Sequence, residues 1–345
     1  KSVPEKLIKF NPTPKLISTY NSYYITKCTN CYYMPYDENN KYIQKWYHIM
    51  NQIVIERDAS EYMWYYMSTL LDQHILMNYM LWLLGGGSNG KSTIIDNIVT
   101  ILGGEIFMKA KSEALCSTCK SNEADTNMIQ TEGLNGIYFS EFGSKSIINA
   151  KQLKSYLGNE QKVSRRFHSD EVKNFKTRLT IIAATNWKLK FDDPDYGTLR
   201  RLLVYNTKMQ IRKPDLYDKN NKYHILENNS YLTLADDKDY AAALFSILVH
   251  YRWKLWTQYN DNIEHPEIQS ATIQKETVEY INSQDSVNKF ITEQIVLMIG
   301  YTSEGKMDKD YTPDRIREEY IEKYAQEHNI TFFDNINHQI TLTSI

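Results

Sequence analysis

The 345-residue chain lacks several features that would decide its class at once. It has no run of about 18 apolar residues, the length that a membrane-spanning helix needs, and no signal peptide precedes its first polar stretch. It has no initiating methionine, so we expect a piece of a longer polypeptide or a chain left after tag removal. Its formal net charge is only −2, which argues against coating nucleic acid through overall basicity. We expect an intracellular, soluble protein with several domains and no membrane partner.

Cysteine is also scarce, and the four cysteines form two Cys-x-x-Cys pairs, Cys28 with Cys31 and Cys116 with Cys119. Two such pairs are able to form a four-thiolate zinc site. About 85 residues separate them here, whereas compact zinc ribbons place their pairs much closer together. The spacing favours free, reduced thiols and leaves zinc as the alternative.

The order of the sequence patterns divides the chain into three segments. Residues 1–75 carry apolar residues at three- and four-residue steps and predict a helical collar. Residues 76–212 alternate strands and helices, which is typical of an α/β core. Residues 213–345 contain helical patterns followed by two short strand-like runs, and they suit a mostly helical module, with a winged helix as one form.

A glycine-rich loop stands between an apolar run ending at Leu84 and a helical pattern. It fits G-x-x-x-x-G-K-[ST], in which successive backbone N–H groups and the helix start converge on phosphate oxygens. We expect Lys91 to reach the β- and γ-phosphates of ATP and the Ser92 hydroxyl to ligate Mg²⁺; a glycine-rich turn without a ligand is the alternative. The residues expected to bind the nucleotide are Gly85, Gly86, Gly87, Ser88, Asn89, Gly90, Lys91, Ser92 and Thr93.

Two polar residues follow later apolar strands. Glu141 ends the run GIYFSE and is expected to help hold Mg²⁺ and to polarise the attacking water. Ser140 precedes it where related ATPases often have another acid, which favours metal contact through water. Asn186 ends LTIIAATN and suits holding the lytic water or sensing the γ-phosphate. The alternatives are a solvated carboxylate and a turn-forming asparagine.

Arg200 and Arg201 stand together before the next strand-like run. In a ring ATPase, one of them would reach the neighbouring subunit's nucleotide as an arginine finger and stabilise charge on the transferring phosphoryl group. Ordinary surface charge is the alternative for the pair.

Positive charge is concentrated between the Glu141 and Asn186 strands. Residues 145–190 contain eleven Lys or Arg and three acidic residues, which indicates a polyanionic partner. Within this stretch, KVSRRFHSDEVKNFKTRL predicts a strand, a turn and a second strand. Such a hairpin is suited to gripping single-stranded DNA in a ring's pore, or else it is a solvated surface hairpin. The residues expected to bind DNA are Arg166, His168, Lys173 and Lys176.

The order of these motifs resembles superfamily 3 helicases, specifically the helicase half of the primase–helicases of poxviruses and other large nucleocytoplasmic DNA viruses. The resemblance covers about residues 40–210 and rests on GxNGKST, the Glu141 strand, the segment GNEQKVSRR, the Asn186 strand and the RR pair. The chain departs from the family at Ser140 and Gln161, where acids are usual. The resemblance implies an AAA+-like P-loop ATPase core in a hexameric ring, with Arg200 rather than Arg201 supplied by the neighbour.

The resemblance also implies the function: an ATP hydrolase and replicative DNA helicase that uses Mg²⁺ and moves 3′ to 5′ on single-stranded or forked DNA. It would act at the viral replication site in the host cytoplasm, with replication proteins as further partners. Two other functions remain open, an AAA+ DNA-binding switch without unwinding activity and a P-loop small-molecule kinase. ATPase stimulation by single-stranded DNA, strand displacement and a phosphorylated small product distinguish the three.

Overall fold

The structure is a computed structural model, and it describes residues 27–73, 75, 77–116, 127–158, 161–165, 172–192, 195–284, 331–335 and 339–343. The chain forms two compact units, Lys1–Ile281 and Asn282–Ile345, which we describe separately. Within the described ranges, no helix is long and apolar enough to cross a membrane.

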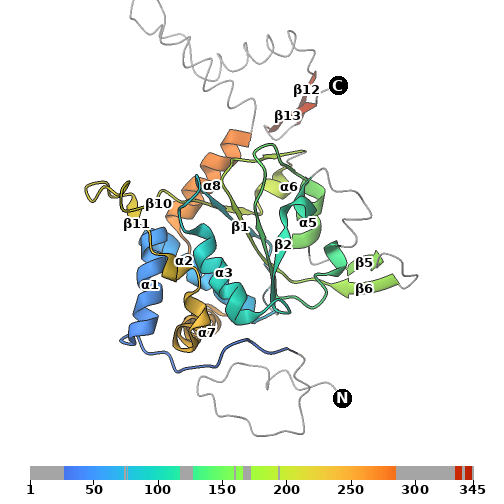
Figure 1. The fold of residues 1–345 in the computed structure, drawn as a ribbon. Helices are drawn as coiled ribbons and strands as arrows, with labels where there is room; N and C mark the ends of the chain where they lie inside the picture. The colour runs from blue at the N-terminus through green and yellow to red at the C-terminus, as the bar shows by residue number, and fades with distance from the viewer. Residues whose placement is uncertain are drawn as a thin grey trace, which may run out of the picture. The chain divides into compact units, whose positions relative to one another are not determined.

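The first unit is built on a five-stranded sheet in which every neighbouring pair is parallel (Figure 1). The strand order is β2-β3-β7-β1-β9, with bounds β1 (Met80–Leu84), β2 (Phe107–Lys111), β3 (Gly136–Ser140), β7 (Thr180–Thr185) and β9 (Leu202–Asn206). Strands β1, β3 and β7 are buried along their whole length, as expected of a parallel sheet covered on both faces. The predicted α/β core is therefore confirmed, and its sheet is parallel.

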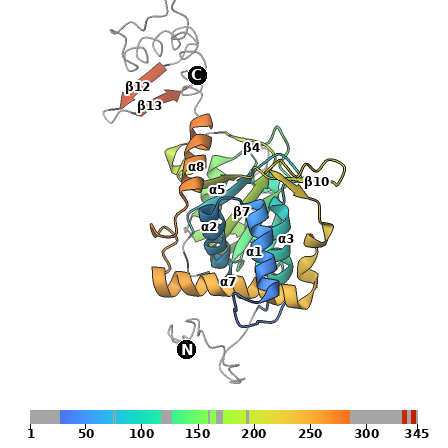
Figure 2. The same cartoon turned by 90° about the vertical axis from the view of Figure 1, so that its left-hand side faces the viewer.

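Helices cover both faces of this sheet. Their bounds are α1 (Lys41–Ile53), α2 (Arg57–Ser68), α3 (Lys91–Leu102), α5 (Ala150–Leu157), α6 (Tyr196–Leu199), α7 (Lys238–Tyr259) and α8 (Ala271–Gln284), with short 3-10 helices η2 (Thr69–Leu71), η3 (Ser112–Leu115), η4 (Asn229–Tyr231) and η5 (Leu234–Asp236). Helix α7 crosses beneath α1, α2 and α3 and contacts all three (Figure 2).

The side chains of β1 alternate between two apolar clusters, because successive residues of a strand point to opposite faces. Leu81 and Leu83 pack with buried residues of α1, α2, α3 and α7. Met80 and Trp82 pack on the other face, with residues of α5 and with Tyr280 of α8. The two clusters together enclose the sheet.

Helix α1 matches the amphipathic pattern expected in this part of the chain. Its buried residues, at three- and four-residue steps, are Ile43, Trp46, Ile49, Met50 and Ile53. Its start is capped by Asn40, whose side chain accepts a hydrogen bond from the backbone N–H of Tyr42 at 2.9 Å. The collar role of this segment stays a prediction.

Smaller strand pairs lie outside the central sheet. They are β4 (Ile147–Ile148) with β8 (Lys190–Phe191), β10 (Gln210–Arg212) with β11 (His224–Leu226), and the antiparallel pair β5 (Gln161–Arg165) with β6 (Val172–Lys176). The last pair confirms the two strands predicted in the basic stretch, and it extends away from the central sheet (Figure 1).

The first unit extends past residue 212, because α7 packs on the helices that cover the sheet. The three-domain division stays a prediction. In the second unit, β12 (Thr331–Asn335) and β13 (Gln339–Thr343) form an antiparallel pair, as the two strand-like runs of the tail suggest. The helical patterns between residues 285 and 330 lie outside the described residues, so the winged helix also stays a prediction.

Candidate nucleotide-binding site

The glycine-rich loop joins β1 to α3 at the carboxyl edge of the sheet. Gly90 is the N-cap of α3 and has φ +80°, in the left-handed region that favours glycine. A Cβ atom on Gly90 would lie 2.7 Å from Cγ1 of Ile53, so a larger residue would clash with α1. Ser88 also has positive φ, and its carbonyl accepts a hydrogen bond from the Ile211 N–H at 2.5 Å. The loop is held by packing on both sides, with the start of α3 directed toward its interior.

Lys91, the first residue of α3, is 7% exposed. Its Nζ donates to the Gly85 carbonyl at 2.7 Å, to Asn89 Oδ1 at 2.7 Å and to Asn186 Oδ1 at 3.2 Å. Burial lowers the pKa of Lys91 to about 8. Within the described part of the chain, no carboxylate forms an ion pair with Lys91. A buried ammonium group held by neutral oxygens is arranged for an anionic ligand such as a phosphate.

Asn186 connects the end of β7 to this loop. Besides accepting from Lys91, its Oδ1 accepts a hydrogen bond from the Gly87 N–H at 3.1 Å. Gly87 and Lys91 lie about one hundred residues earlier in the chain. The structure therefore brings these three expected site residues together.

Ser92 and Glu141 line the same pocket as the loop residues, with a volume of about 340 Å³. Glu141 directly follows β3 with φ +65°, which is uncommon outside glycine, and its side chain is 85% exposed. A hydroxyl and a carboxylate at the mouth of a phosphate pocket are hard oxygen ligands of the kind that Mg²⁺ prefers. The residues present therefore fit a nucleotide with its magnesium ion.

Two further residues of the sheet, one lining the pocket and one buried behind Ser92, were not found from the sequence. Lys109 of β2 has its Nζ 3.4 Å from Asp96 Oδ1 and 4.0 Å from Glu141 Oε1. Tyr138 of β3 donates its hydroxyl proton to Ser92 Oγ at 3.1 Å. Lys109 in FMKAK and Tyr138 in GIYFS are partners in the register of β2 and β3, so their side chains lie on the same face of the sheet. This could have been found from the sequence once β2 and β3 were known to be neighbours.

Arg200 and Arg201 lie at the amino ends of the strands, whereas the loop lies at their carboxyl ends. They precede β9, which begins beside Met80 at the start of β1, and the Met80 N–H donates to the Arg201 carbonyl at 2.8 Å. The five residues of β1 separate this end from Gly85, about 16 Å at about 3.3 Å per residue. The structure does not bring either arginine to the phosphate pocket of its own chain. Arg200 is exposed and Arg201 is half-buried.

The expected DNA-binding residues are only partly described. Lys173 and Lys176 lie on β6, and the Lys176 side chain is exposed. Arg166 and His168 lie outside the described residues. Their role in binding DNA stays a prediction.

The zinc alternative is also untested in full, since Cys119 lies outside the described residues. Cys28 is exposed, Cys31 is half-buried and Cys116 is buried. Across the part of the chain that the structure describes, no cluster of three or more metal-ligating side chains is found. Free thiols stay the prediction for these positions.

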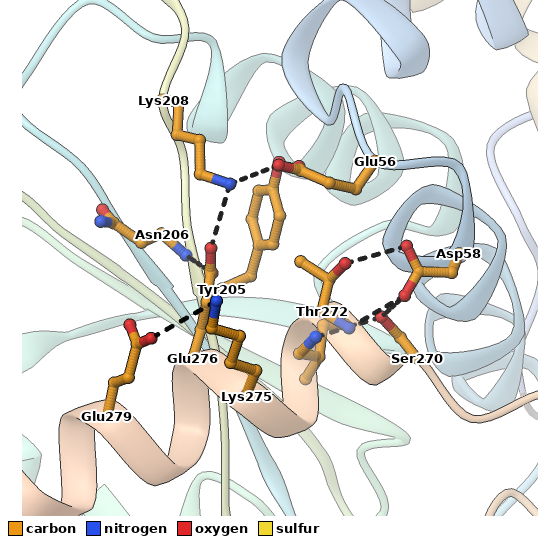
Figure 3. Close-up of polar contacts among 11 residues, drawn as sticks. Glu56, Asp58, Tyr205, Asn206, Lys208, Ser270, Thr272, Lys275, Glu276 and Glu279 are labelled. Carbon is orange, nitrogen blue, oxygen red and sulfur yellow. Dashed lines mark hydrogen bonds and ion pairs between the residues drawn. The ribbon is translucent and has the colours of Figure 1, made fainter.

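The segment after β9 joins the loop to α8 through a polar network (Figure 3). Lys208 forms ion pairs with Glu56, at the start of α2, and with Glu276 of α8, the latter at 3.4 Å. Glu276 accepts a hydrogen bond from the Asn206 N–H at 2.5 Å. The Val204 N–H, also on β9, donates to Thr277 Oγ1 of α8 at 2.8 Å. Side chains of α8 thus pair with backbone groups of the last strand of the sheet.

A second anchor fixes the start of α8. Asp58 of α2 accepts hydrogen bonds from the Ser270 hydroxyl at 2.7 Å and from the Thr272 N–H at 3.0 Å (Figure 3). The pKa of Asp58 is lowered: burial raises it, and these hydrogen bonds outweigh that effect. Helix α8 is therefore tied to both α2 and the sheet.

Comparisons with known proteins find relatives in two viruses. It is 30% identical over 285 residues to "Putative primase C962R" of African swine fever virus, covering 82% of this chain and 29% of that protein. It is 23% identical over 277 residues to "Putative helicase L207/L206" of Acanthamoeba polyphaga mimivirus, covering 79% of this chain and 28% of that protein. The chain thus spans less than a third of the length of these relatives. No family model matches it.

One solved structure supports the fold. The apo structure of the NrS-1 C terminal region superposes with a TM-score of 0.50 at 11% identity, covering 86% of this chain and 64% of that one. At this identity the likeness concerns the arrangement of strands and helices only. It agrees with the parallel sheet and its covering helices.

Proposed function

We propose that the chain, which resembles the superfamily 3 primase–helicases of large DNA viruses, binds ATP with Mg²⁺ and hydrolyses it to move along single-stranded DNA. The observation that carries the proposal is the meeting of Lys91, Glu141 and Asn186 around one pocket. They follow three different strands of a parallel sheet, at the carboxyl edge where such sheets bind ligands.

Each residue has a role that follows from its position. Lys91 and the backbone N–H groups of the loop bind the β- and γ-phosphates, which replace the neutral oxygens now bound to Lys91. Glu141 orients the attacking water by accepting its hydrogen bond, and Asn186 contacts the γ-phosphate or that water. Bound magnesium, held by Ser92 and through water by Glu141, would neutralise charge on the phosphates.

The placement of Arg200 and Arg201 supports a ring. Both lie about 16 Å along the sheet from the loop pocket of their own chain, a placement that suits contact with the nucleotide of a neighbour. Arg200 is the better candidate because its side chain is exposed. We propose a hexamer with nucleotide between subunits and with the β5–β6 hairpins directed to DNA, moving 3′ to 5′ during viral replication in the host cytoplasm.

ATP hydrolysis with and without single-stranded DNA tests the proposal. Wild-type protein should hydrolyse ATP, and single-stranded DNA should raise the rate. Lys91→Ala should lower the rate by about 100-fold or more, since one essential phosphate donor is lost. Retained turnover in this variant would contradict the assignment of the loop.

A DNA-binding ATPase switch without unwinding activity is the second candidate, because the names of the relatives include a primase as well as a helicase. Strand displacement on a tailed duplex separates the two: the helicase releases the strand only with ATP, and the switch does not.

A further inference from the structure

Ser92, which lines the pocket and is the expected magnesium ligand, forms a hydrogen-bonded pair of hydroxyls with a buried tyrosine behind it. Tyr138 donates its proton to Ser92 Oγ at 3.1 Å. Tyr138 and Ser140 lie two residues apart on β3 and so share a face of the strand. Ser140 stands where related ATPases often have an acid, and Tyr138 supplies the contact to Ser92 from the same face.

Packing fixes the position of the Tyr138 hydroxyl. The Tyr138 side chain is 0% exposed and belongs to the apolar cluster that includes Ile94, Ile95 and Ile98 of α3. Because α3 also carries Ser92, the donor and acceptor are held by the same helix–strand contact.

The hydrogen bond leaves Ser92 with a defined set of free positions. A serine hydroxyl has one proton to donate and two lone pairs. When Tyr138 occupies one lone pair, the other remains for a cation and the proton remains for a phosphate oxygen. Tyr138 thereby orients the hydroxyl without binding the cation itself.

The charges of the pocket indicate which groups supply negative charge to a bound magnesium ion. Among its described lining residues, Glu141 is the only carboxylate, whereas Lys91 and Lys109 are both cationic. Asp96, which lies outside the lining, is 3.4 Å from Lys109 Nζ and offsets its charge, so a dication meets no net negative charge in the pocket without the nucleotide. Magnesium is usually bound through one or two carboxylates together with substrate phosphates, and here the phosphates must supply most of the negative charge.

We propose that Tyr138 is a positioning residue that orients Ser92 in place of the missing acid, and that the pocket takes up magnesium only together with the nucleotide. This inference rests on the proposed function, because it concerns the same phosphate site. It predicts two separable properties: no metal binding without nucleotide, and a metal effect on nucleotide affinity that depends on the Tyr138 hydroxyl.

The first property is measured by electron paramagnetic resonance of Mn²⁺ as the probe for the metal. Added to nucleotide-free wild-type protein, Mn²⁺ should keep the full signal of the free ion. With ADP or a non-hydrolysable ATP analogue present, the free Mn²⁺ signal should fall further than it does in a control that contains the nucleotide without protein. Loss of the free-ion signal without nucleotide would overturn the inference.

The second property is measured by titrating a fluorescent ATP analogue, first in EDTA and then at increasing Mg²⁺. Tyr138→Phe should bind the analogue in EDTA within about twofold of wild type, because the phosphate donors remain. The Mg²⁺ concentration for the half-maximal gain in affinity should rise about tenfold, as is typical when a residue behind a metal ligand is removed.

Tyr280→Phe is the matched control. Tyr280 is 2% exposed and donates to the Leu189 carbonyl at 2.7 Å, but it packs in the cluster on the other face of the sheet. This variant loses a comparable buried hydrogen bond and should keep the wild-type Mg²⁺ dependence. Thermal denaturation of both variants compares their folding.

A double-mutant cycle separates positioning from general stability. Ser92→Ala should abolish the Mg²⁺ effect, and adding Tyr138→Phe should change nothing further, because Tyr138 acts through Ser92. Wild-type protein that binds no nucleotide would overturn the proposed function and this inference with it. Normal binding with an unchanged Mg²⁺ dependence in Tyr138→Phe, or additive effects in the cycle, would overturn the inference alone.

Discussion

Asn186 holds two donors that a bound phosphate needs, and this makes its replacement by aspartate informative. In the structure, its Oδ1 accepts from the Gly87 N–H at 3.1 Å and from Lys91 Nζ at 3.2 Å. Asn186→Asp keeps the shape of the side chain and adds a negative charge. The carboxylate should hold Lys91 more strongly and repel the incoming phosphates.

The magnitude follows from these contacts. The Lys91–Asn186 hydrogen bond already has one charged partner, and a negative charge on the acceptor adds a Coulomb attraction of about 1–1.5 kcal/mol at this distance in a high dielectric. This attraction has to be overcome before Lys91 turns to a phosphate. Repulsion between the carboxylate and the phosphates adds about 1 kcal/mol or more at this exposed position. Nucleotide affinity should therefore fall by about 10- to 100-fold.

The assay is equilibrium titration of a fluorescent ATP analogue in EDTA, where metal plays no part. Asn186→Ala is the control, since it frees both donors without adding charge, and its affinity should stay within about threefold of wild type. High salt should reduce the defect of the aspartate variant, because the repulsion is screened. Wild-type affinity in Asn186→Asp would refute the reasoning, because it would mean that Lys91 does not contact the bound phosphates.

Three further predictions concern stability. Tyr66→Phe removes a fully buried hydroxyl whose single proton is shared between two backbone carbonyls at 2.8 Å and whose oxygen accepts from the Leu81 N–H at 3.2 Å. The free energy of unfolding in urea should fall by about 2–3 kcal/mol, and a change below about 0.5 kcal/mol would be inconsistent with those bonds. Burial and the nearby Lys254 charge lower the pKa of His250 to about 4. Between about pH 6.5 and 4 the unfolded chain therefore binds a proton that the folded chain does not, and the free energy of unfolding should fall by up to about 3 kcal/mol as the pH drops, less for partial exposure. Thermal melts of His250→Phe should show a weaker pH dependence, and a profile identical to wild type would exclude His250 as the cause. Gly90→Ala adds a strained left-handed alanine and a clash with Ile53, so melting temperature and nucleotide binding should both fall, and unchanged binding would contradict a rigid loop.

The position and conformation of the glycine-rich loop could be predicted from sequence because its signal is local. The conformation around Gly90 and the start of α3 depends on residues within one short stretch, and GGGSNGKST contains all of them. Glu141 and Asn186 were predictable for a related reason. Each ends an apolar strand, and parallel strands place such residues at one edge.

Lys109 and Tyr138 could not be predicted in the same way, because their roles depend on which strands are neighbours. Lys109 reaches Glu141 only because β2 pairs with β3 in a register that sets Lys111 beside Ser140. Tyr138 reads in the sequence as one more apolar strand residue, and only the packing of α3 on β3 places its hydroxyl at Ser92. The separation of Arg200 from the loop also follows from strand direction rather than from spacing.

The contacts between α8 and β9 have a consequence for how this chain can be divided in experiments. Strand β9 is an edge strand of the sheet, and an uncovered edge strand presents unpaired N–H groups that another extended chain is able to bind. Here Thr277 and Glu276 occupy two of those groups, at Val204 and Asn206. A truncated version that stops before α8 would expose these backbone groups of the edge strand and should self-associate by strand addition, whereas a version that retains α8 keeps them hydrogen-bonded.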